Sequence, residues 1–224
     1  MSISSEITRL QTAKNTLKTK INTKNDSEHQ ITNETLDEFG DFVDSIPTGG
    51  GNTWQVPNGL KFTGSATQLP TLDLTNVTGT EGLANMFYQC SSLTSVSIIN
   101  IPSSITSMYE CFDQCSALIA IPEIDTSNIK NMSEMCYNCQ SLVTVPILDT
   151  SKLVGTGFSR AFSFCSNLSN TSLNNILRMC INAVNLSSNQ KKLSVVGLTS
   201  AQATTCQTLS NWDDFVAAGW ITGF

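Results

Sequence analysis

The eight cysteines are the residues of this chain best suited to chemistry, because a thiol can act as a nucleophile, bind a metal ion or form a disulfide. Four of them recur at steps of 25, 24 and 26 residues, each with a leucine three positions later: Cys90 and Leu93, Cys115 and Leu118, Cys139 and Leu142, Cys165 and Leu168. Stacked repeats place equivalent side chains over one another. Parallel side chains suit a column of thiols better than a bridge. We therefore predict buried, free thiols that serve packing.

Cys136 and Cys139 have the spacing of half a zinc site or of a redox pair. Cys136, however, stands where the neighbouring repeats have Phe87 and Phe112, so we interpret it as a core substitution. The single histidine, His29, lies in a polar segment between two expected helices. No phosphate-binding loop and no His-Glu-x-x-His motif is present. The sequence therefore predicts no enzyme activity, no metal site and no cofactor.

Asp73, Asp125 and Asp149 recur after a Pro-x-apolar pattern and suggest two interpretations. Aspartates at one repeat position could line an edge as calcium ligands. Such residues more often close a turn by accepting hydrogen bonds from backbone amides, and we favour that role.

The spacing of the repeated block sets the expected fold. A period near 25 residues falls in the range of leucine-rich repeats. Each repeat would hold a short strand, at 93–96, 118–121 and 142–145, followed by a turn and a short helical or irregular segment. We expect an α+β protein with a leucine-rich-repeat solenoid over residues 60–170, and we take the four Cys-Leu pairs as its core.

Both flanks of the repeats have helical patterns. Residues 1–46 are expected to form a helical hairpin whose first helix offers an apolar stripe for assembly: Ile3, Ile7, Leu10, Leu17 and Ile21. Residues 47–59 are a glycine-rich linker and the start of an N-terminal cap, with a turn and then a short strand expected between Trp54 and Phe62. Residues 171–224 are expected to form a helical C-terminal cap, with helices near 172–181, from Thr199 or Ser200 through Leu209, and near 212–220.

Charge and hydropathy exclude several classes of protein. A net charge of −6 argues against nucleic acid as a partner, because that binding relies on Lys and Arg. No basic run followed by an apolar stretch opens the chain, and no segment approaches the ~18 apolar residues of a membrane span. We expect no signal peptide and no membrane insertion.

The repeating unit Met-Phe-x-x-Cys-x-x-Leu-x-x-Ile-Pro-x-Leu-Asp-Thr-Ser-Asn resembles the BspA-type leucine-rich repeats and the similar repeat of mycoplasma surface lipoproteins, over about residues 60–170. Ser97 in place of Pro, Cys136 in place of Phe and Ala161 in place of Met depart from it. The stretches from Ile3 to Phe39 and from Gly197 to Trp220 resemble bacteriophage structural proteins from gut bacteria.

This resemblance implies a non-enzymatic virion protein of a tail, a fibre or a capsid decoration, made in the bacterial cytoplasm and displayed on the virion surface. Its partners would be other virion proteins and a host-surface receptor, protein or glycan, with a homo-oligomer expected and a trimer the commonest phage arrangement. The strand positions offer a weakly marked binding surface: Thr94, Ser95, Ile119, Ala120, Val143 and Thr144. Alternatives are a bacterial BspA-like adhesin and an intracellular protein-binding module; a strongly acidic groove would favour the latter, but the acids are scattered along the sequence.

Overall fold

The computed structural model describes residues 53–56, 60–62, 66–69 and 71–224. The chain divides into two units, Met1–Trp54 and Gln55–Phe224. The predicted hairpin at 1–46, with His29 and the five assembly residues, lies outside the described residues, as does most of the expected linker at 47–59.

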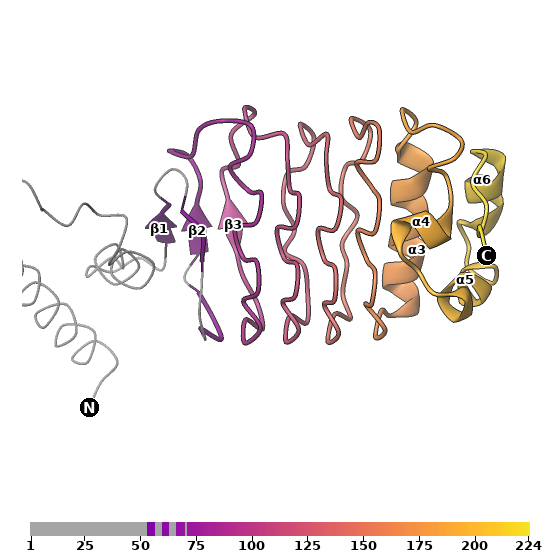
Figure 1. The fold of residues 1–224 in the computed structure, drawn as a ribbon, viewed down its shortest axis with the longest axis horizontal. Helices are drawn as coiled ribbons and strands as arrows, with labels where there is room; N and C mark the ends of the chain where they lie inside the picture. Colours follow the sequence, from indigo (N-terminus) through magenta and orange to yellow (C-terminus); the bar gives the residue numbers. More distant parts are fainter. Residues whose placement is uncertain (1–52, 57–59, 63–65, 70) are drawn as a thin grey trace, which may run out of the picture. The chain divides into compact units, whose positions relative to one another are not determined.

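Within the second unit, successive coils of the chain lie side by side, one coil for each repeat (Figure 1). Backbone hydrogen bonds join neighbouring coils at every second residue. The amides of Asn85, Phe87 and Gln89 donate to carbonyls of the next coil at 2.9, 2.9 and 2.8 Å. Asn85, Phe87 and Gln89 are the third, fifth and seventh residues of an eight-residue block that ends at a repeat cysteine. The blocks are residues 83–90, 108–115, 132–139 and 158–165. The same three bonds recur between each block and the next. Because these groups find their partners in the next coil, the coils are stable only as a stack.

Regular strands are few among the described residues. β1 (Thr53–Gln55), β2 (Thr71–Asp73) and β3 (Ile98–Ile99) form one sheet in the order β1-β2-β3. β2 and β3 run parallel, with Leu72 opposite Ile98.

The prediction of strands at 93–96, 118–121 and 142–145 is wrong, because no continuous strand forms at these segments. These segments contribute only isolated bridges, Gln68 to Ser95 and Ala120 to Thr144. Pro122 and Pro146 follow two of the segments directly, and proline has no amide hydrogen for a ladder. β3 forms where Ser97 takes the place of that proline.

The predicted order of a turn and then a strand between Trp54 and Phe62 is also wrong. The strand comes first, as β1, and residues 60–62 have no regular structure. Phe62 instead joins the repeat: its amide donates to the carbonyl of Met86 at 2.7 Å and its ring stacks on Phe87. The ring is therefore held by the same contacts as its counterparts in the following coils.

Left-handed backbone recurs at the third and seventh residue of each block. The third residues have φ between 52° and 57°, and the seventh residues between 59° and 62°: Asn85, Glu110, Glu134 and Arg160, then Gln89, Gln114, Asn138 and Phe164. None of these is glycine, and such a conformation costs about 1–2 kcal/mol for other residues. The bonds between coils offset that cost, because they require this turn in every coil.

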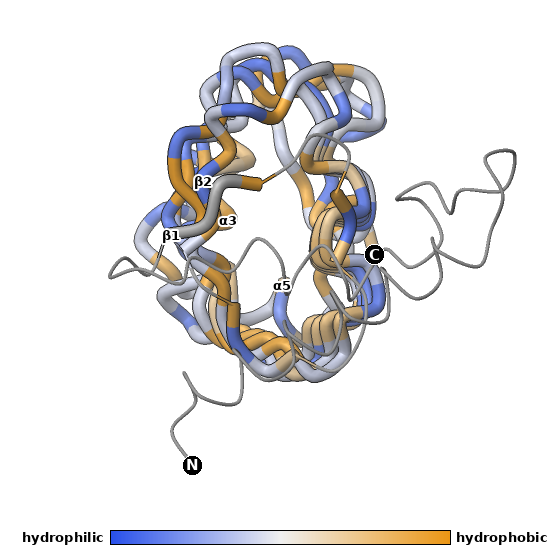
Figure 2. Tube along the Cα trace, turned by 90° about the vertical axis from the view of Figure 1, so that its left-hand side faces the viewer, coloured by the Kyte–Doolittle hydropathy of each residue, from blue (hydrophilic) through white to orange (hydrophobic). Residues whose placement is uncertain are grey.

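The core of the stack consists of columns of equivalent side chains. Phe62, Phe87 and Phe112 stack with centroids 5.0 and 5.2 Å apart and planes within 13°. Cys136 follows in the next coil and ends this run of rings. Figure 2 looks along the stack and shows the coils lying closely over one another.

Helices follow the last coil. α3 (Asn170–Asn182) is capped by Ser169, α5 (Ser200–Cys206) by a capping box of Thr199 and Gln202, and α6 (Trp212–Ala217) follows. They lie where the sequence predicts helices, although α5 ends before Leu209. The short helix α4 (Leu193–Val196) was not predicted.

α4 occupies the open edge of the last coil. The amides of Arg160 and Phe162 donate to the carbonyls of Val195 and Val196 at 2.6 and 3.1 Å. These are the bonds that a further coil would otherwise accept. The helix therefore accepts two of the ladder bonds that the last coil offers.

Candidate functional site

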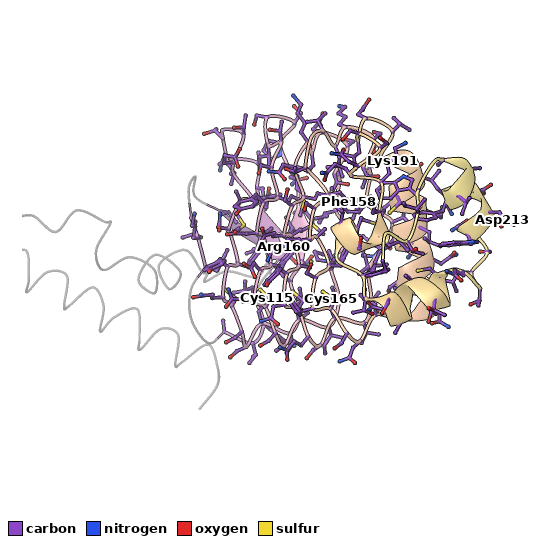
Figure 3. All side chains as sticks on the ribbon, turned by 45° about the vertical axis from the view of Figure 1, so that its right-hand side comes forward. Cys115, Phe158, Arg160, Cys165, Lys191 and Asp213 are labelled. Atoms are coloured by element: carbon purple, nitrogen blue, oxygen red, sulfur yellow. The ribbon has the colours of Figure 1, made fainter. Side chains whose placement is uncertain are left out.

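The column of thiols is a structural feature of the coils. The Sγ atoms of Cys115, Cys139 and Cys165 each lie 3.0 Å from a carbonyl of the preceding coil, and that of Cys90 lies 3.4 Å from one. Figure 3 labels Cys115 and Cys165. Burial raises the pKa of Cys90 and Cys136 to about 11. These thiols are therefore protonated at neutral pH and are poor nucleophiles.

All eight cysteines are buried and free. The hydrogen bond to Cys136 is the main cause that raises the pKa of Cys139. Among the described residues, no group of three or more His, Cys, Asp and Glu side chains is placed to hold a metal ion. The contact between Cys136 and Cys139 thus joins two neutral thiols in the core.

The repeated aspartates close turns, so this prediction is confirmed. The Oδ1 atom of Asp73 accepts from the Thr75 amide at 3.0 Å, and that of Asp125 accepts from Ser127 at 2.9 Å. Asp149 accepts from the Ser151 amide at 2.8 Å. The hydrogen bonds from Ser127 lower the pKa of Asp125.

The six positions proposed from the sequence as a binding surface lie on neighbouring coils. The amide of Ile119 donates to Thr94 at 3.1 Å, and that of Val143 donates to Ile119 at 2.9 Å. Ala120 and Thr144 share a bridge. Ile119 and Val143 are 52% and 39% exposed, so this small-residue face presents two aliphatic side chains and no charge.

A second surface gathers the charged and aromatic side chains of the turns. We call it the acidic-tyrosine face, and it comprises Tyr88, Tyr109, Glu110, Asp113, Glu134, Tyr137 and Arg160. The Arg160 guanidinium lies 3.3 Å from the Glu134 carboxylate and 4.7 Å from the centre of the Tyr137 ring. Phe164 meets the same ring edge-on at 5.1 Å. Arg160 is labelled in Figure 3.

The electrostatic character of this face is negative. The pKa of Tyr109 is raised to about 12, first by its hydrogen bond with Glu110 and then by burial and the charges of Glu110, Glu134 and Asp113. The acids that are scattered in the sequence therefore act on one another in the structure. The repeat register could have revealed this, because Glu110 and Glu134 are both third in their blocks.

No helix in the described part of the chain is long and apolar enough to cross a bilayer. The described coils and their helical end define a stacked-repeat protein whose coils carry charged residues on their turns.

A family profile described as "Mycoplasma protein of unknown function, DUF285" matches residues 81–212, which is more than half of the chain. The protein belongs to this family. The matched region runs from the first block of the stack to the start of α6. No curated protein and no solved structure matches the chain significantly.

Proposed function

We propose that the protein is a non-enzymatic virion protein of a bacteriophage, in a tail, a fibre or a capsid decoration, with a leucine-rich-repeat solenoid that binds the host surface. The observation that carries the binding role is the division of side chains in each coil. Thiols and the phenylalanine rings of the core columns are buried, whereas tyrosine and amide groups and most carboxylates recur on the outside. Repeat surfaces of this kind suit extended binding.

The thiols support a binding role over a catalytic one. Catalysis by cysteine needs a thiolate, and burial raises the pKa of Cys90, Cys136 and Cys206 to about 11. The carboxylates of Asp73, Asp125 and Asp149 are engaged in turns.

Residues 1–46 would assemble the protein or attach it to other virion proteins. This role rests on the apolar stripe of Ile3, Ile7, Leu10, Leu17 and Ile21, which fits a helix that packs against another helix. A homo-oligomer, such as a trimer, would present several copies of the coils to one cell.

A bacterial cell-surface adhesin is the second candidate. The family description names mycoplasma proteins, and the repeat resembles that of mycoplasma surface lipoproteins.

Immunogold electron microscopy separates the two candidates. Antibodies against the full chain would be applied to cells and to purified phage particles from the bacterial culture that carries the gene. Gold on particles supports the virion protein, and gold on cell envelopes supports the adhesin. Gold on neither, with the protein present in the cell lysate, overturns both and favours an intracellular binding module.

Light scattering tests the assembly role on the full-length chain. The double substitution Leu10→Asp and Leu17→Asp should lower the solution mass to that of one chain, because it places two charges on the apolar stripe. Ser5→Asp with Thr16→Asp is the control with equal added charge off the stripe. An unchanged mass in the first variant would contradict the assembly role.

A further inference from the structure

We draw no further inference here: the strongest candidate, the surface patch that the exposed Phe164 ring forms with Tyr137 and Arg160 on the turns of the last two blocks, rests on contacts within the chain alone, and nothing in the structure shows what covers it.

Discussion

The coils and the helical end of this protein are stabilised in different ways. In the coils, alternate backbone amides of each block donate to the next block, and equivalent side chains form columns. In α3, α5 and α6 the backbone bonds lie within each helix, and side-chain burial joins the helices. A coil therefore depends on its neighbours, whereas a helix can begin and end by its own capping residues.

The two regions meet at α4 and Gly197. Two carbonyls of α4 accept the last ladder bonds of the stack, and Gly197 follows with φ of 104°. A Cβ atom at Gly197 would lie 2.4 Å from the Ser163 Oγ and 2.6 Å from its amide nitrogen. Position 197 therefore has no room for a side chain.

The largest expected effect breaks a column. Phe112→Ala removes a ring with no exposed surface that stacks on Phe87, and should lower the free energy of unfolding by about 4 kcal/mol. Phe215→Ala in α6 is the matched change in the helical end. Hydrogen exchange should show faster opening of the coils on both sides of Phe112, but only of the helices for Phe215. If both variants speed exchange in the coils and in the helices alike, the two regions are not stabilised in different ways.

The second largest effect is expected at Gly197, where the coils meet the helical end. Gly197→Ala should cost about 3 kcal/mol, because it adds a clash with Ser163 to the strain of positive φ. Gly219→Ala is the control for strain alone: its φ is 82° and a Cβ there meets nothing within 4 Å. It should cost about 1 kcal/mol. Chemical denaturation measures both, and similar costs would mean that the close approach to Ser163 is not decisive.

A smaller effect depends on pH. The pKa of Asp113 is raised to about 6 in the fold, so its ionisation destabilises the protein as the pH rises through that value. Asp113→Asn should therefore raise the free energy of unfolding by about 1 kcal/mol at pH 7.5 and change it little at pH 3.5. Thermal unfolding at the two pH values checks this, with Asp213→Asn as the exposed control. If Asp113→Asn changes the free energy of unfolding equally at both pH values, the raised pKa of Asp113 is not the cause.

The smallest effects should have opposite signs in the two regions. Gln89→Gly in the stack should stabilise the protein by about 0.5 kcal/mol, since Gln89 is exposed and has φ of 62°. Arg178→Gly on the exposed side of α3 should destabilise it by about 1 kcal/mol. Urea unfolding of the two variants gives both values. The same sign in both would show that the left-handed turns carry no strain.

Prediction from sequence succeeded where local chemistry is sufficient. Thr199 begins α5 because its hydroxyl bonds the Gln202 amide, and this depends only on residues three apart. The aspartate turns are as local, since Asp125 bonds Ser127. The strands failed because Pro122 and Pro146 remove ladder amides, which the apolar spacing does not show. α4 was missed because its position depends on the last coil.

The sequence by itself determined the repeat, the positions that point inward and the helices of the C-terminal end, because spacing and capping are local properties of the chain. Only the tertiary structure decided which outward residues meet. Glu110, Asp113 and Glu134 are spread over two repeats, yet stacking brings them onto one face and leaves the Asp113 oxygen without a donor. The physical reason is that stacking fixes the register between coils, and this register sets which charges lie close enough to interact.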